Sequence, residues 1–129
     1  MRLLLDTHAF LWWLAGDARL PPRAREAIAD AANEVYVSAA SAWEVATKAR
    51  LGKLPEAARI AHDFESYIQS QQFLSLSISV EHGQRAGLLA GEHRDPFDRM
   101  LVAQSQAENM VLVSNEEIFD SMGATRLWK

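Results

Sequence analysis

Carboxylates in this sequence recur where a predicted strand ends or a predicted helix begins. Asp6 closes the apolar run 3–5, and the further acids at similar points are Glu44, Asp95, Asp98 and Glu116. The carboxyl ends of parallel strands meet at one edge of a sheet, which is where open α/β folds bind their ligands. Acids gathered there offer only oxygen atoms, which suit Mg²⁺ or Mn²⁺ rather than zinc. The pattern therefore predicts a divalent-cation site.

A carboxylate site of this kind would hydrolyse phosphate esters. Paired ions about 4 Å apart generate hydroxide from water and stabilise both the attacking and the leaving oxygens of a phosphodiester. Arg94 and Arg99 stand beside Asp95 and Asp98 and are expected to neutralise these acids or to contact phosphate. The residue types therefore indicate metal-dependent phosphodiester chemistry.

Each acid also has a purely structural interpretation. Asp6 can cap the following helix by accepting hydrogen bonds from its free N–H groups. A Ser-Ala-Trp-Glu segment matches a capping box in which Glu44 reaches back to the Ser41 amide. Asp95 directly precedes a proline and is expected mainly as a helix cap, and Glu116 fits an acidic helix start. Only the convergence of several acids favours a metal site over these local roles.

Apolar periodicity predicts strands that alternate with helices along the whole chain. The expected strands are 3–5, 35–37, 73–78, 110–113 and 125–128. The expected helices are 7–15, 22–31, one capped by Ser38 or Ser41 and running to 51, a single helix over 55–68, 80–90, 96–107 and 116–122. This alternation favours an α/β fold with a parallel sheet and helices on both of its faces.

The composition limits the class of protein. The chain has 129 residues, enough for one domain with a real core, and 49% of them are hydrophobic. It has no cysteine, which excludes disulfides, zinc–thiolate sites and cysteine nucleophiles. The formal charge of −4 argues against a broad basic surface that coats nucleic acid, but it allows local binding of a polyanion through metal ions and a few cations. No segment is long and apolar enough to span a bilayer, so we expect a cytoplasmic protein without membrane contacts.

Other kinds of site find little support in the sequence. It has no glycine-rich phosphate loop and no serine-hydrolase elbow, and its histidines have no paired spacing for a metal ion. We expect His62 and His82 at the surface. We expect His8 and His93 near the carboxylates, as hydrogen-bonding residues rather than ligands. The four tryptophans are expected in the core or at an interface, not as a ladder for stacking bases.

Four segments together carry a family resemblance. Residues 3–8 read LLLDTH, and residues 38–44 read SAASAWE, followed by Lys48 and by GKL at 52–54. Residues 93–101 read HRDPFDRML, and the chain closes on Leu-Trp-Lys. The set resembles PIN-domain ribonucleases, and most closely the VapC-type toxins of bacterial type II toxin–antitoxin pairs. The resemblance spans essentially the whole chain, and the Trp-Glu and Asp-Pro-Phe-Asp-Arg segments are specific to that branch.

The resemblance implies a three-layer α/β/α fold with a mainly parallel sheet, formed by residues 1–129 as a single PIN domain. It implies a metal-dependent endoribonuclease toxin with a Mg²⁺ or Mn²⁺ site, an RNA substrate, a cognate antitoxin that blocks the site, and a homodimer. The family's acids fall on Asp6, Glu44 and Asp98, with Glu116 completing the set. The expected supporting residues are Thr7, Ser114, Asp95, Arg94, Arg99 and Lys48.

The fourth acid departs from the family pattern. The family usually shows Thr or Ser, one further residue and then Asp, whereas this chain has Ser114, Asn115 and Glu116. The longer glutamate reaches a second ion directly or only through water, so the number of ions stays open. Two alternatives follow: a catalytically weak or silent PIN-like binding protein, and a metal-dependent phosphatase or DNA nuclease that uses the same acids.

Overall fold

The structure, a computed structural model, describes residues 1–129 and is built around a five-stranded parallel sheet. The strands are β1 (Arg2–Leu5), β2 (Glu34–Ser38), β3 (Leu74–Leu76), β4 (Val111–Val113) and β5 (Arg126–Leu127). They lie in the order β3-β2-β1-β4-β5, and every neighbouring pair is parallel. The chain therefore builds outward from β1 to β3, then returns to place β4 on the other side of β1. This reversal creates a switch point beside β1, the usual position of a ligand site in such sheets.

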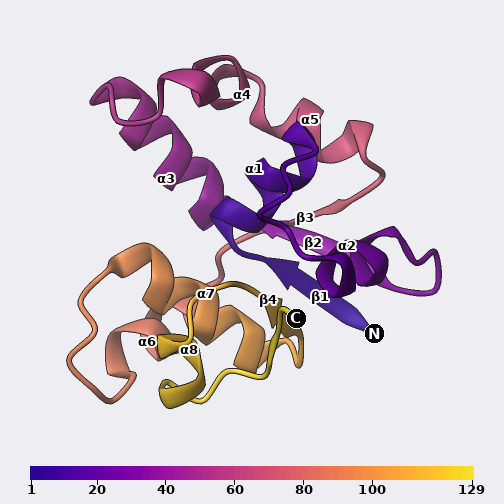
Figure 1. Ribbon diagram of the computed structural model, residues 1–129. Coiled ribbons are helices and arrows are strands. Elements are labelled where there is room, and N and C mark those ends of the chain that lie inside the picture. The colour runs from indigo at the N-terminus through magenta and orange to yellow at the C-terminus, as the bar shows by residue number, and fades with distance from the viewer.

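Helices cover both faces of the sheet (Figure 1). One group contains α1 (Thr7–Ala15), α2 (Pro22–Ala29), α3 (Ala39–Arg50), η1 (Pro55–Ala57), α4 (Ala58–His62) and α5 (Phe64–Ser70). The other group contains α6 (Val80–Leu88), α7 (Pro96–Ala107) and α8 (Ile118–Ser121). The predicted three-layer α/β/α architecture is confirmed.

The apolar run of β1 divides the core between the two faces. Leu3 and Leu5 belong to the larger cluster with Phe10, while Leu4 packs in the smaller cluster with Leu101 and Phe119. Successive side chains of a strand point to opposite faces, so a strand buried on both faces needs an uninterrupted apolar run. All three leucines are fully buried.

The helices whose bounds were predicted best are those with clear capping residues at their ends. The helix α1 follows the cap Asp6 and ends at Gly16, whose φ of 63° is the left-handed conformation that suits glycine. The helix α7 starts at Pro96, directly after the cap Asp95. Of the two caps considered for α3, the structure uses Ser38.

The single helix predicted over 55–68 is wrong, because this region forms η1, α4 and α5. Asp63 leaves the helical conformation, with φ −131° and ψ 36°, between α4 and α5. The break allows Phe64 and Ile68 to be buried in the larger core cluster. The predicted helix over 116–122 shortens to Ile118–Ser121. None of the helices combines the length and apolarity needed to cross a membrane.

Candidate active site

Asp6 lies where β1 ends and α1 begins, at the switch point of the sheet. Its carboxylate Oδ1 accepts a hydrogen bond from the Ala9 amide at 2.8 Å and so caps α1. Its own amide donates to the Val113 carbonyl of β4 at 3.0 Å. The side chain is only 6% exposed. The capping role is therefore confirmed, and it leaves a buried carboxylate at the edge where β1 and β4 end.

Glu44 points inward from α3 and is equally buried. Its Oε1 accepts the Thr7 hydroxyl at 2.6 Å, and its Oε2 pairs with the Lys48 ammonium at 2.5 Å. The Thr7 hydroxyl also lies 2.9 Å from that of Ser41. The capping box expected for Glu44 is wrong, because α3 begins three residues earlier and Glu44 turns toward the start of α1. Thr7 thus joins the first strand–helix junction to α3.

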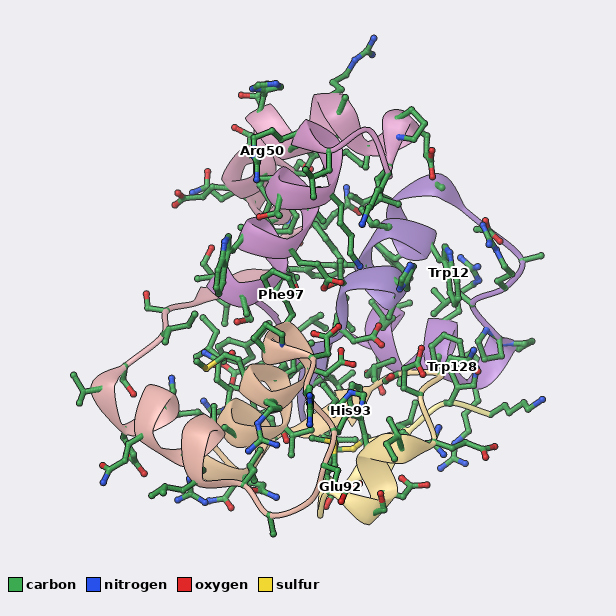
Figure 2. The ribbon with its side chains drawn as sticks, turned by 90° about the vertical axis from the view of Figure 1, so that its left-hand side faces the viewer. Trp12, Arg50, Glu92, His93, Phe97 and Trp128 are labelled. Carbon is green, nitrogen blue, oxygen red and sulfur yellow. The ribbon has the colours of Figure 1, made fainter.

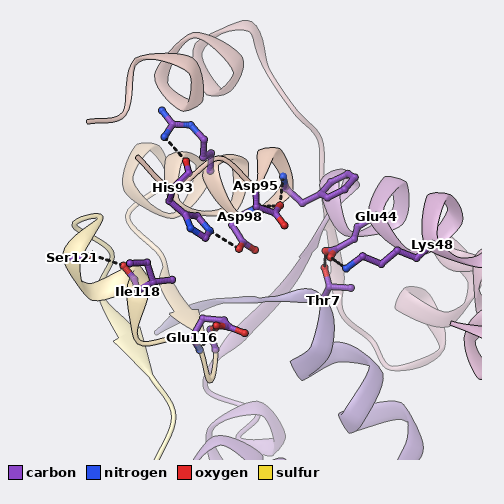
Figure 3. Close-up of polar contacts among 12 residues, drawn as sticks. Thr7, Glu44, Lys48, His93, Asp95, Asp98, Glu116, Ile118 and Ser121 are labelled. Carbon is purple, nitrogen blue, oxygen red and sulfur yellow. Dashed lines mark hydrogen bonds and ion pairs between the residues drawn. The ribbon is translucent and has the colours of Figure 1, made fainter. Parts of the chain in front are cut away.

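The two acids at the N-terminal end of α7, Asp95 and Asp98, have different roles (Figure 3). Asp95 accepts hydrogen bonds from the amides of Phe97 and Asp98, at 2.9 and 3.1 Å, as the expected cap. Asp98 lies in the first turn of the helix, and its Oδ2 is 2.8 Å from Nε2 of His93. His93 therefore contacts a site carboxylate, as expected from the sequence.

Glu116 follows β4 in an exposed loop. Its amide donates to the hydroxyl of the buried Ser114 at 2.9 Å, which fixes the turn after the strand. Its carboxylate makes no hydrogen bond or ion pair within the chain. Glu116 is thus the most accessible of the four predicted acids.

The charges of these acids interact across the sheet edge. Burial raises the pKa of Asp6 to about 7, and the charges of Asp98 and Glu116 act in the same direction. Hydrogen bonds from Ser114 and from the Ala9 amide oppose this shift. Because Asp98 and Glu116 both act on Asp6, residues from β1, α7 and the loop after β4 lie within electrostatic range of one another.

Asp98 connects Glu44 to the same group. Burial raises the pKa of Asp98, the hydrogen bond with His93 opposes the rise, and the charges of Asp95 and Glu44 add to it. Asp98 therefore interacts electrostatically with Glu44 of α3 and with Asp6 at the end of β1. Asp6 in turn interacts with Glu116. The structure brings all four predicted acids to one edge, beside the ends of β1 and β4. Figure 3 shows three of them, Glu44, Asp98 and Glu116, around this edge.

The donor set fits a hard divalent cation, although the side chains do not form a closed ligand cage. No three His, Asp or Glu side chains are close enough to hold one ion as they stand. Glu44 is turned to Lys48 and Asp98 to His93, so both would exchange these partners for an ion. Burial is the main cause of the raised pKa of Asp6, and the charges of Asp98 and Glu116 add to it; a bound cation would favour the ionised carboxylate against both effects. The four acids offer only oxygen ligands, as Mg²⁺ and Mn²⁺ prefer.

The predicted phosphate contacts occupy different surroundings. Arg99 donates to the carbonyls of Ala86, Gly87, Leu89 and His93. Arginine has five N–H donors, so most of them hold the segment before α7 against the end of α6. Arg94 is exposed. Lys48 has the acid Glu44 as its partner. Among these three cations, Arg94 is the one that stands open to solvent.

Of the remaining histidines, His82 differs from expectation. His82 is buried rather than at the surface, because it caps α6 together with Ser79 and its Nε2 lies 3.0 Å from Glu108. Its position three residues after a serine resembles a capping box, but with histidine in place of the usual Glu or Gln. His8 lies against Trp12 in a separate pocket between α1 and residues 54–60. None of the four predicted acids lines this pocket.

The fold recurs in solved structures of low sequence identity. A chain of VapBC2 from Rickettsia felis, bound to a promoter DNA fragment, matches with a TM-score of 0.70 at 17% identity, and all of both chains is covered. VapC20 of Mycobacterium tuberculosis, a toxin that cleaves the sarcin–ricin loop, matches with a TM-score of 0.69 at 16% identity, over 98% of this chain and 99% of that one. A toxin–antitoxin complex from Klebsiella pneumoniae gives 0.57 at 16% identity, over 97% and 95%. These likenesses show a shared fold.

The sequence itself adds the family assignment. A comparison with curated protein sequences found no significant match. The family model of the PIN domain matches residues 3–124, nearly the whole chain. That segment includes all four acids and, apart from Arg2 of β1, every strand of the sheet except β5. The chain belongs to the PIN domain family.

Proposed function

We propose that this protein is a Mg²⁺- or Mn²⁺-dependent endoribonuclease that acts as the toxin of a toxin–antitoxin pair. The observation that carries the proposal is the gathering of Asp6, Glu44, Asp98 and Glu116 at the switch point of a PIN-family sheet. The acids come from four separate parts of the chain, and local capping accounts for only Asp6 among them. A shared ligand explains why they meet.

The acids would hold the cation, which when bound supplies an activated water and neutralises charge on the scissile phosphate. Asp6 is fixed by its cap, and Thr7 holds Glu44 through a 2.6 Å hydrogen bond. His93 orients Asp98, and Ser114 supports both Asp6 and the turn that carries Glu116. The chain thus holds the acids at one edge of the sheet, and Glu44 and Asp98 would turn from Lys48 and His93 to bind an ion.

Cations near these acids would position the phosphate backbone. Lys48 would turn from Glu44 to the substrate once an ion neutralises that carboxylate. Arg94 is exposed and lies just before α7, where it can reach a phosphate. Arg99 is better explained as an anchor for the loop before α7, because its donors already bind backbone carbonyls.

The similar proteins support the proposed biological role. One solved relative in fold is a toxin–antitoxin complex, and another is a toxin that cleaves the sarcin–ricin loop. We extend to this chain a cognate antitoxin that blocks the carboxylates, a homodimer, an RNA substrate and a cytoplasmic location. Residues 1–129 would act as a single PIN domain.

Cleavage of single-stranded RNA tests the proposal. Wild-type protein should cut an RNA panel in Mn²⁺ and lose this activity in EDTA. Asp98→Ala should reduce the rate by at least about a hundredfold, because it removes a ligand without touching the core. Its circular-dichroism spectrum should stay that of the wild type.

Other results would point to the alternatives. RNA binding without cleavage in Mn²⁺ would favour a silent binding protein. Faster cleavage of DNA, or of a small phosphomonoester, would favour a DNA nuclease or a phosphatase. Full activity in the Asp98→Ala variant would refute the site assignment.

A further inference from the structure

The outer side of α3 carries an exposed tryptophan next to the carboxylates. Ala39, Trp43, Ala46 and Arg50 follow one another at steps of four, three and four residues, so they lie on one face of the helix. All four are exposed. Trp43 is 58% exposed, which is unusual for so large an apolar side chain. The neighbouring alanines are too small to cover the indole.

Phe97 holds this indole at the border of the candidate site. The two ring centroids lie 4.7 Å apart with the planes at 75°, an edge-on contact between α3 and α7. Trp43 directly precedes Glu44, and Phe97 directly precedes Asp98. Figure 2 shows Phe97 near the start of α3 and Arg50 near its end. The aromatic pair is therefore fixed beside the acids, while most of the indole stays open to solvent.

The charge of this segment is opposite to that of the whole protein. Between residues 39 and 55 the cations are Lys48, Arg50 and Lys53, and the only acid is the buried Glu44. Arg50 and Lys53 are exposed and form no ion pair within the chain. The protein as a whole has a formal charge of −4. A local excess of positive charge beside an exposed aromatic ring is suited to a polyanion whose units carry flat rings.

We propose that the outer side of α3 binds single-stranded RNA next to the scissile bond. Trp43 would stack on a base that flanks the cleaved phosphate, and Arg50 and Lys53 would contact phosphates further along the strand. The inference rests on the proposed function and adds to it the surface along which the substrate lies. It revises the sequence-based expectation for Trp43, which foresaw only a core or interface role.

A second copy of the chain is the competing occupant, and charge disfavours it. A two-fold symmetric interface brings the same patch of both copies together. Here it would bring the cations Arg50 and Lys53 of both copies into one interface, with no exposed acid between residues 39 and 55 to offset them. An RNA backbone has the complementary charge.

Binding of a labelled RNA tests the stacking contact. The probe is a fluorescein-labelled single-stranded RNA of twelve nucleotides and mixed sequence, and Asp98→Asn is present in every protein to prevent cleavage. Trp43→Leu keeps an apolar side chain but loses the ring, and it should weaken binding by about tenfold. Trp43→Phe keeps a ring and should stay within about threefold of the parent. Both variants should melt within a few degrees of the parent, because the indole is mostly exposed.

The salt dependence of RNA affinity tests the phosphate contacts. Arg50→Ala should weaken binding and lower the slope of log K against log salt by about 0.7, the value for one phosphate contact on a single strand. Arg23→Ala removes the same charge from α2, on the opposite side of the molecule (Figure 1), and should leave the slope unchanged. Equal effects of the two substitutions would overturn the proposed track, because they would reflect net charge alone.

The failure of this inference is distinguishable from that of the proposed function. If wild-type protein cleaves RNA while Trp43→Leu, in the Asp98→Asn background, binds RNA as tightly as its parent, the stacking contact is wrong and the nuclease stands. If Trp43→Leu changes the molecular mass in sedimentation and leaves RNA affinity unchanged, the surface is a contact between copies. If wild-type protein neither binds nor cleaves RNA, both proposals fall together.

Discussion

At Asp6 a helix cap and a candidate metal ligand are the same side chain. Accepting the Ala9 amide fixes its rotamer, and burial makes its ionised form unfavourable. Asp98 and Glu116 add their charges to this penalty. A carboxylate that only capped α1 would be better placed in water, where the same hydrogen bond is made without the burial.

The raised pKa of Asp6 predicts a pH-dependent effect of Asp6→Asn on the metal-free protein. Below about pH 4 the side chain is protonated in both the folded and the unfolded state, so wild type and variant differ little. Between pH 4 and 7 the unfolded state ionises first, and the wild type loses stability as the pH rises. Above pH 7 the variant should be more stable by an amount on the order of 2–4 kcal/mol, since asparagine caps α1 without the charge. Urea unfolding in EDTA from pH 4 to 8 measures this difference, and a gap that does not change with pH would contradict it.

Single residues were predictable from the sequence only where the role follows from position along the chain. Asp6 and Asp95 stand at element ends and cap helices as expected. The partner of Glu44 was not predictable, because Thr7 lies 37 positions away and meets it only through the fold. Local matching to a capping box favoured the wrong partner there.

Among the elements, α7 begins with two carboxylates of different roles: Asp95 stabilises the helix, and Asp98 is a candidate metal ligand. Asp95 satisfies two of the free amides at the helix end, and Asp98 faces His93 and the sheet edge. Both acids benefit from the positive end of the helix dipole. The two carboxylates should therefore respond differently to the same substitution.

Asp95→Ala should lower the free energy of unfolding by about 1 kcal/mol, because it removes the cap of α7. The stabilisation by Mn²⁺ should remain. Asp98→Ala should have the reverse profile, with little loss of stability in EDTA and loss of most of the Mn²⁺ effect. Thermal melts of both variants with and without Mn²⁺ distinguish the two roles, and Asp95→Asn, which can still cap, serves as the control for the first.

Element bounds were predicted well where caps and breakers mark them. The bounds of α1 match, as do those of α7, since Gly16 and Pro96 act locally. The region 55–68 failed because the break at Asp63 depends on burying Phe64 and Ile68 in the core. Such a break is decided by tertiary packing, which leaves no local signal in the sequence.

At the scale of the whole molecule, strand order brings the acids together. Alternation of strands and helices predicted a parallel sheet, and so a shared edge, but not that β1 lies at the centre between β2 and β4. That order places the loops after β1 and β4 side by side. The convergence of Asp6 and Glu116 is thus a property of the topology.

Crowded carboxylates predict that divalent ions stabilise the protein, and more so at higher pH. At pH 8 Asp6 is ionised, whereas at pH 5 an ion must displace its proton, so apparent affinity falls. Millimolar Mn²⁺ should raise the melting temperature by several degrees at pH 8 and by clearly less at pH 5. An equal shift at both pH values would indicate binding elsewhere on the surface.

The most direct measurement of the central claim is calorimetric titration of Mn²⁺ into the wild type and four amide variants. These are Asp6→Asn, Glu44→Gln, Asp98→Asn and Glu116→Gln. If the acids form one site, each variant should bind Mn²⁺ at least about tenfold more weakly than the wild type while keeping its fold. Wild-type affinity retained in three or four of the variants would show that these carboxylates do not share an ion.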